Sequence, residues 1–341
     1  MNPQKIISAS VHAIRSKQSL QTAELRIVPL AGDASLRQYF RIFVPQEKSY
    51  VLMLVEPFSA KENNFLLIRD LLEQSKIPCP KVVGVEESRG AILLEDLGDR
   101  TMLHELNATR DEASEKRLFQ EALDLLVTFH KKAKKENAVG KIIPGFSQAF
   151  DEEKLMWEVD FTFEHLFKSY LRRDIPEKTA QGMRAIFQDI CKCLEAEPRV
   201  FTHRDYHSRN IMLRESGEMV CIDFQDARMG LRQYDLASIL RDSYYQLSDE
   251  RVYQLLDYYC DKVKAEEKIS FDRTHFIKLF DLMSIQRNYK AIGSFTSFYA
   301  KRGDPMYLRF VGNTFENIRK NLMKFPEYKD LLRDLYQYYY F

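Results

Sequence analysis

The sequence has few of the residues that build disulfide-rich or metal-binding proteins, and it lacks long apolar runs. Its 341 residues include 5 cysteines, 12 glycines, 11 prolines and 1 tryptophan. The cysteines are odd in number and lack the paired spacing of metal sites, which indicates free thiols in a reducing compartment. No apolar run approaches the roughly 20 residues of a membrane-spanning helix, and the N-terminal residues lack the core of a signal peptide. We therefore expect a cytoplasmic protein without a membrane partner.

Neither sign of charge is in excess. The 51 Lys and Arg residues nearly balance the 50 Asp and Glu residues, so no overall field attracts nucleic acid. This balance favours a small-molecule ligand, and we expect a monomer that binds no nucleic acid. The length is that of two domains.

The most informative segment is residues 203–210, of sequence HRDYHSRN, followed by Asp223 and Phe224. Asp205 would orient an acceptor hydroxyl and accept its proton, while Asn210 and Asp223 would hold Mg²⁺. The apolar residues 219–222 predict a strand that ends at Asp223. An isolated His-x-Asp is common by chance, and Asp-Phe pairs often belong to turns. The combination nevertheless predicts a kinase.

The hydrophobic pattern changes along the chain. Up to residue 97 it predicts five strands and one helix, at 25–30, 36–44, 50–55, 81–85, 91–94 and 61–75. Beyond residue 101 it predicts helices, at 112–135, 151–172, 177–195, 234–246, 250–264, 275–299 and 308–324. We therefore predict an α+β protein: a nucleotide-binding domain, residues 1–97, with a small antiparallel sheet, and a helical domain, residues 98–341, with the catalytic loop and the acceptor site.

The predicted nucleotide site is incomplete. In the turn at 31–35, backbone N–H groups such as those of Gly32 and Ser35 could cover phosphates, although a plain hairpin turn explains the same residues. The third strand has no Lys to hold phosphates, so we expect Arg37 and Arg41 to do so, with Glu62 able to orient one of them.

A second nucleotide contact is expected after the fifth strand. There the backbone of Glu95, Asp96 and Leu97 would bind adenine, and a plain interdomain linker is the alternative.

Residues 273–309 contain seven Lys and Arg residues against two acids, Asp281 and Asp304. Such a segment would repel a polycationic acceptor and attract one with a carboxylate, unless the cations only solvate helix faces. Arg287 and Lys290, spaced i,i+3, are the first candidates for acceptor contact. His203 and Arg209 are further candidates.

Several segments together resemble the aminoglycoside phosphotransferase family, within it the bacterial kinases that phosphorylate the anomeric hydroxyl of N-acetylmuramate and N-acetylglucosamine. They are residues 32–41, 93–99, 203–210, 223–227, 234–238, 286–293 and 299–303. The resemblance implies a protein-kinase-like bilobal fold and transfer of phosphate from ATP, with Mg²⁺, to a sugar hydroxyl in cell-wall salvage.

The resemblance assigns the same roles to Asp205, Asn210, Asp223 and the segment 95–97. It also implies that Asp226 braces the loop that carries the metal ligand Asp223. Asp235 is placed to cap a helix. Two alternatives stay open. One is a nucleotide-binding pseudokinase scaffold, suggested by Met53 where a Lys would stand; the other is a kinase of an aminoglycoside, choline, homoserine or a fructosamine.

Overall fold

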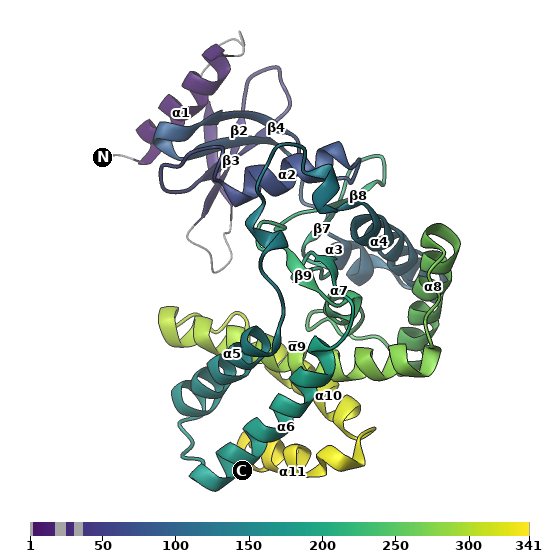
Figure 1. Cartoon of the computed structure of the whole chain (residues 1–341). Coiled ribbons are helices and arrows are strands. Elements are labelled where there is room, and N and C mark those ends of the chain that lie inside the picture. Colours follow the sequence, from purple (N-terminus) through teal and green to yellow (C-terminus); the bar gives the residue numbers. More distant parts are fainter. Residues whose placement is uncertain (1–2, 18–24, 31–36, 341) are drawn as a thin grey trace. The chain divides into compact units, whose positions relative to one another are not determined.

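The computed structural model describes residues 3–17, 25–30 and 37–340 (Figure 1). The chain divides into two compact units, and each unit is made of several separate segments of the sequence. The first comprises Met1–Arg100, Glu136–Ile143 and Met212–Gln225, and the second comprises Thr101–Lys135, Pro144–Ile211 and Asp226–Phe341. The expected domain boundary after residue 97 stays a prediction.

The first unit contains a five-stranded antiparallel sheet in the order β1-β2-β3-β5-β4. Its strands confirm the five predicted ones: β1 (Arg26–Pro29), β2 (Gln38–Phe43), β3 (Tyr50–Leu54), β4 (Val82–Glu86) and β5 (Ala91–Glu95). The central pair is in register with Leu52 opposite Leu93, and both side chains are fully buried. Burial on both faces suits the apolar runs of β3 and β5.

Two helices pack in this unit. Helix α2 (Asn64–Gln74) was predicted, and it begins where the Asn63 side chain accepts a hydrogen bond from the Leu66 N–H. Helix α1 (Pro3–Lys17) was missed: Ile7, Val11 and Ile14 recur at helical spacing and join the core that covers Leu52 and Leu93. A separate two-stranded sheet, β7 (Ile211–Leu213) with β8 (Met219–Cys221), confirms the predicted strand before Asp223.

The second unit is mainly helical, which confirms the α+β class. Its strands β6 (Val200–Thr202) and β9 (Arg228–Gly230) pair antiparallel. Its helices are α3 (Met102–Ala108), α4 (Glu112–Lys132), α5 (Glu152–Thr162), α6 (Glu177–Glu195), α7 (Arg232–Leu240), α8 (Asp249–Glu267), α9 (Arg273–Arg302), α10 (Val311–Leu322) and α11 (Lys329–Tyr340). The sequence prediction missed α3 and α11.

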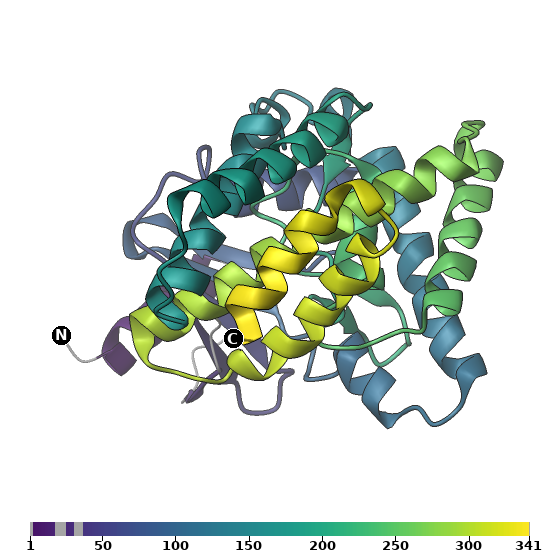
Figure 2. The same ribbon diagram turned by 90° about the horizontal axis from the view of Figure 1, so that it is seen from below.

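Helix α9 is the centre of the second unit and contacts α5, α6, α7, α8 and α10 (Figure 2). A π-helix, η4 (Phe163–Tyr170), continues α5 and also packs on α9. At this crossing a Cβ on Gly293 would lie 2.3 Å from Thr162 Oγ1 and 2.7 Å from its Cα, so only glycine fits. The close approach fixes α5 beside the middle of α9.

The second unit corrects one predicted helix boundary. The predicted helix 234–246 is too long, because α7 ends at Leu240 and the carboxylate of Asp242 accepts the Tyr244 N–H. None of the helices in the described part of the chain combines the length and the apolar character needed to cross a membrane.

Candidate active site

The loop between β6 and β7 carries the predicted catalytic residues, and two buried carboxylates hold its backbone. Asp235 of α7 accepts hydrogen bonds of 2.8 Å from the N–H groups of both His203 and Arg204. Asp242, just beyond α7, accepts 3.0 Å and 2.5 Å bonds from the N–H and the hydroxyl of Ser208. The start of the loop is thus attached to the first turn of α7, and its later part is attached to the residue two positions beyond the end of α7.

The expectation that Asp235 caps a helix is wrong. Helix α7 begins at Arg232, and its N-cap residue, Leu231, makes no side-chain cap bond. Asp235 already lies inside the helix and is fully buried. Its carboxylate serves the catalytic loop, since two of that loop's N–H groups have it as their acceptor.

A chain of buried hydrogen bonds continues from Asp235. His130 Nε2 lies 3.0 Å from Asp235 Oδ2, and His130 Nδ1 lies 2.8 Å from the Tyr259 hydroxyl. Arg232 donates to that hydroxyl oxygen at 3.1 Å and pairs with Glu267. Since the Tyr259 oxygen accepts from Arg232, its own proton is directed to Nδ1, and the Nε2–H donates to Asp235. Burial lowers the pKa of His130 in spite of the nearby carboxylate, so the ring is neutral.

This neutral histidine makes folding stability depend on pH. Below a pH of about 6.5 the unfolded chain binds a proton at His130 and the folded chain does not, so stability is lost as the pH falls. We expect His130→Gln, which keeps a donor for Asp235, to be less stable than the parent at pH 7.5. The deficit should shrink by up to about 1.4 kcal/mol at pH 5.5. Urea denaturation of both proteins at each pH measures this; an unchanged deficit would contradict it.

Asp205 is held among cations. Its Oδ1 lies 3.2 Å from Lys290 Nζ, its Oδ2 lies 3.8 Å from Arg204 Nε, and its side chain is 24% exposed. Burial disfavours the carboxylate, but the charges of Lys290, Arg204 and Arg287 prevail and hold the pKa of Asp205 well below its usual value. Asp205 is therefore ionised and able to accept a hydrogen bond from a hydroxyl.

Hydrogen bonds within the rest of the loop join Asn210 to Asp205. Asn210 Nδ2 donates a 2.9 Å hydrogen bond to the Asp205 carbonyl. His207 N–H donates to the same carbonyl at 3.0 Å, and the His207 carbonyl accepts from Asn210 N–H at 2.8 Å. Burial and the charge of Arg287 lower the pKa of His207 to about 3, so its ring is neutral too. These bonds orient the amide of Asn210 relative to Asp205.

Arg204 has a left-handed backbone, with φ at 80°. Such a conformation is costly for a non-glycine residue and tends to occur at functional sites. The guanidinium lies 3.4 Å from Asp226 and 3.8 Å from Asp205. Asp226 therefore contacts the catalytic loop through Arg204, and its expected role in bracing the loop of Asp223 stays a prediction.

The candidate acceptor contacts differ in burial. The His203 ring is fully buried against Phe129 and Tyr206, which leaves it a packing role and removes it from our candidates for direct contact. Arg287 is 4% exposed, and its Nε has no hydrogen-bond partner in the described part of the chain. Arg209 stacks on Tyr244, with 4.9 Å from guanidinium to ring centre.

Asp223 belongs to the first unit. It too has a left-handed backbone, with φ at 64°, two residues after the end of β8. Gln225 Nε2 donates to its Oδ1 at 2.7 Å, and Arg37 lies 3.5 Å away. The next residue, Phe224, stacks on Phe65 of α2 at 5.1 Å and so fixes the turn.

Ion pairs order the segment after β5. Glu95 pairs with Arg214 at 2.6 Å and accepts the Lys81 N–H. Arg41 binds Asp96 at 2.7 Å, and it also binds Asp99 at 2.9 Å. Arg41 thus serves this segment, which leaves Arg37 as our candidate for phosphate contact.

Four other residues were expected at the nucleotide. Gly32 and Ser35 lie outside the described residues. The Glu62 side chain is exposed and precedes α2, which begins at Asn64. Leu97 directly follows Asp96, whose side chain pairs with Arg41.

The predicted metal ligands suit Mg²⁺ in chemistry. The described residues contain no group of three His, Cys, Asp or Glu side chains that could hold an ion by themselves. Mg²⁺ commonly takes only one or two protein oxygens and completes its shell with substrate phosphates and water. An amide oxygen from Asn210 and a carboxylate from Asp223 fit this requirement.

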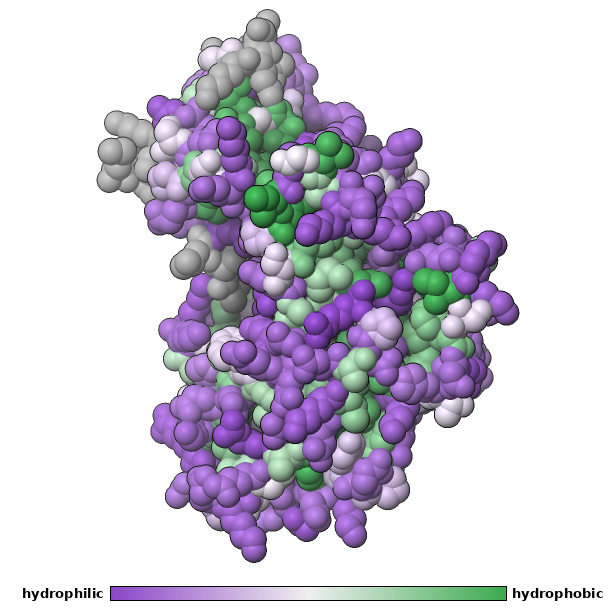
Figure 3. Space-filling model, viewed as in Figure 1, coloured by the Kyte–Doolittle hydropathy of each residue, from purple (hydrophilic) through white to green (hydrophobic). Residues whose placement is uncertain are grey.

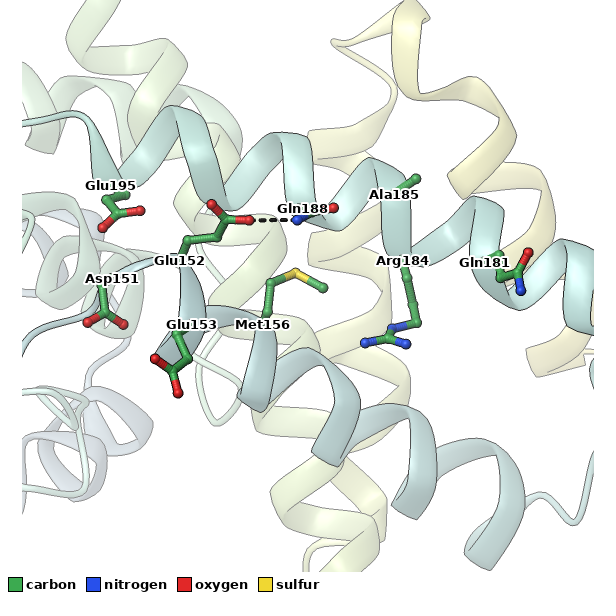
Figure 4. A pocket seen from close by; sticks show the side chains of 9 residues that line it. All are labelled: Asp151, Glu152, Glu153, Met156, Gln181, Arg184, Ala185, Gln188 and Glu195. Atoms are coloured by element: carbon green, nitrogen blue, oxygen red, sulfur yellow. Dashed lines mark hydrogen bonds between the residues drawn. The ribbon is translucent and has the colours of Figure 1, made fainter.

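A cavity of about 700 Å³ lies elsewhere, between α5 and α6 (Figure 4). Its lining includes four carboxylates, those of Asp151, Glu152, Glu153 and Glu195, and the Gln188 side chain donates to Glu152 at 2.7 Å. None of the predicted site residues lines it. Its negative charge would repel ATP and an acidic sugar, so it is no candidate for the active site.

Comparison with known proteins bears on the site as a whole. A model of the phosphotransferase enzyme family matches residues 26–271. The chain is 30% identical over 307 residues to the N-acetylmuramate/N-acetylglucosamine kinase of Pseudomonas aeruginosa, covering 89% of this chain and 86% of that one. It is 28% identical to a kinase of the same name from Neisseria meningitidis serogroup B, over 92% of each chain.

Solved structures resemble the fold at lower sequence identity. A choline kinase from Streptococcus pneumoniae has a TM-score of 0.61 at 14% identity, covering 94% of this chain and 100% of that one. The ADP-bound aminoglycoside phosphotransferase APH(2'')-Ib has a TM-score of 0.58 at 17% identity, covering 93% of this chain and 98% of that one. These similarities confirm the expected protein-kinase-like fold.

Proposed function

Because the chain belongs to the phosphotransferase enzyme family, we propose that it transfers the γ-phosphoryl group of ATP to the anomeric hydroxyl of N-acetylmuramate or N-acetylglucosamine. It is an enzyme that phosphorylates a hydroxyl group of a small molecule. The observation that carries the choice of acceptor is the breadth of the similarity to the Pseudomonas aeruginosa kinase, which extends over 89% of this chain. Such a product would enter cell-wall sugar salvage.

In the proposed reaction Asp205 orients the sugar hydroxyl and takes its proton. The sugar oxygen forms a bond to the γ-phosphorus, the bond from phosphorus to the ADP oxygen breaks, and Asp205 later releases the proton to water. The Lys290 ammonium, 3.2 Å from Asp205, would lie beside that hydroxyl. Arg287, Lys290 and Arg209 would contact the acceptor.

The proposed nucleotide contacts are those expected from the sequence. The backbone of Glu95, Asp96 and Leu97 would bind adenine, and Arg37 would contact phosphates. Asn210 and Asp223 would hold Mg²⁺, which when bound neutralises charge on the phosphates. All five cysteines are free thiols, which supports a reducing, cytoplasmic location.

The test is ADP release by the purified protein with Mg·ATP and a panel of acceptors, with the product's phosphate located by ³¹P NMR. The panel holds N-acetylmuramate, N-acetylglucosamine, glucose, choline, homoserine, a fructosamine and kanamycin. We expect 1-phosphates from the two N-acetyl sugars. Turnover of another acceptor alone would reject the sugar assignment, and thermal stabilisation by ATP without any turnover would favour a pseudokinase.

A further inference from the structure

Helix α5 presents three distinct faces. One is buried and includes Leu155, Glu158 and Thr162. A second, with Glu152, Glu153 and Met156, lines the acidic cavity toward α6 (Figure 4). The third carries Lys154, Trp157 and Phe161, which recur at i, i+3 and i+7 and therefore share one side of the helix. This third face has no role in the reaction described so far.

The third face is an aromatic surface with a cation upon it. Lys154 Nζ lies 3.7 Å from the centre of the Trp157 ring, which stacks on Phe161 at 5.4 Å. Trp157 is 54% exposed, although it is the largest apolar side chain available and a folded protein usually buries most of it. An exposed aromatic ring beside a charged group is typical of a ligand-binding surface.

Contacts between α5 and α9 fix this face relative to Asp205. Gln286 of α9 donates to the Glu158 carboxylate at 3.1 Å and to the Leu155 carbonyl at 3.2 Å. Lys154 precedes Glu158 by four residues, and Lys290 follows Gln286 by four, so each lies one turn from this contact. Lys290 in turn pairs with Asp205. Helix α5, and with it the third face, therefore belongs to the same unit as Asp205 and is joined to it through α9.

The neighbourhood has more positive than negative charge. Burial and the like charges of Arg204, Arg228 and Lys290 lower the pKa of Lys154, although Glu158 opposes them. Burial and Arg204 likewise lower the pKa of Arg228. Cations crowded in this way are stabilised by an added anion. The cations are Lys154, Arg204, Arg228, Arg287 and Lys290, against the acids Glu158, Asp205 and Asp226.

From these contacts we propose that Lys154 and Trp157 form part of the acceptor subsite: the exposed part of the Trp157 ring packs against the sugar, and Lys154 binds the carboxylate that N-acetylmuramate has and N-acetylglucosamine lacks. The inference rests on the proposed function, because it assigns residues that discriminate between its two acceptors. Lys154 is then a specificity-determining residue. A competing role for the cation is contact with the γ-phosphate of ATP, which would affect both sugars alike.

Paired kinetics on the two sugars test Lys154. We expect Lys154→Met to raise KM for N-acetylmuramate about tenfold, because one ion pair to a partly buried lysine is lost. The kcat and KM for N-acetylglucosamine should stay within about twofold of the parent values. Lys154→Arg should restore most of the N-acetylmuramate affinity. The matched control is Lys168→Met in η4, whose ammonium pairs with Glu164 and should leave both sugars unchanged.

Trp157 offers a binding measurement that needs no turnover, because it is the only tryptophan of the chain. Titration of either sugar without ATP should shift its fluorescence to shorter wavelength as the exposed ring is covered. Trp157→Leu should weaken the binding of both sugars to a similar degree.

Four results would overturn the inference. Equal losses for both sugars in Lys154→Met, or a rise in KM for ATP, would assign the cation to the nucleotide. Turnover of both sugars with unchanged tryptophan emission would remove Trp157 from the subsite while leaving the proposed function intact. If the parent protein phosphorylates neither sugar, the proposed function fails and this inference fails with it.

Discussion

Replacing Asp205 by asparagine is expected to lower kcat about a thousandfold and to change the KM values for ATP and sugar only a few-fold. The amide has nearly the same size and can still accept a hydrogen bond from the hydroxyl, but it cannot take the proton. The parent carboxylate is ionised, because Lys290, Arg204 and Arg287 hold its pKa well below the usual value against the effect of burial. Initial rates at saturating Mg·ATP, with thermal melts to verify folding, measure the effect.

Asp226→Asn is the matched control for this experiment. Asp226 also pairs with Arg204, at 3.4 Å, so its substitution removes one negative charge from the same cluster. It does not remove the proposed base, and we expect a loss of no more than about tenfold in kcat. Comparable losses in the two variants would mean that Asp205 acts through the charge of Arg204. A rate for Asp205→Asn near that of the parent would remove Asp205 from the base role.

Much of the fold could be predicted from local patterns in the sequence. The apolar alternation of the first hundred residues predicted all five strands of the sheet, and the run 203–210 with Asp223 was found from residue types alone. Helix α1 was missed since its apolar positions, Ile7, Val11 and Ile14, stand among polar residues and gain their meaning only from the sheet that they cover. The periodicity of a short amphipathic helix is a weak signal without its partner.

Long-range contacts could not be read in the same way. Asp235 and Asp242 hold the catalytic loop from more than thirty residues away, and no spacing rule connects a carboxylate to a distant backbone N–H. The same holds for Arg41, whose two carboxylate partners lie more than fifty residues further along the chain. Lys154 was overlooked because a single lysine on an amphipathic helix is usually solvated.

The second large effect is expected for Asp235→Asn. The Oδ1 of Asp235 accepts from the Arg204 N–H, and its Oδ2 accepts from both the His203 N–H and His130 Nε2. An asparagine keeps only one acceptor oxygen, and its NH₂ group would face the backbone N–H of either Arg204 or His203 in a fully buried position. We expect a loss of about 3 kcal/mol in the free energy of unfolding, the usual cost of leaving buried polar groups unpaired. Because the loop would shift, kcat should fall about a hundredfold.

Urea denaturation and initial rates on the same preparations check this prediction, with Asp257→Asn as control. Asp257 pairs with Arg273 on the exposed surface, and its substitution should cost less than about 1 kcal/mol. Equal destabilisation by the two substitutions would contradict the anchoring role of Asp235.

The His130 network allows a sharper form of the same experiment. When the asparagine NH₂ group takes the position of Oδ2, it faces two donors, and in the double variant with His130→Gln the glutamine can turn its carbonyl oxygen toward it and remove one of these contacts. The double variant should therefore be more stable than the sum of the single effects predicts. Strict additivity would mean that His130 and Asp235 do not act through their 3.0 Å contact. One backbone N–H of the loop, that of Arg204 or that of His203, would still lack its acceptor, so activity should stay low even where stability recovers.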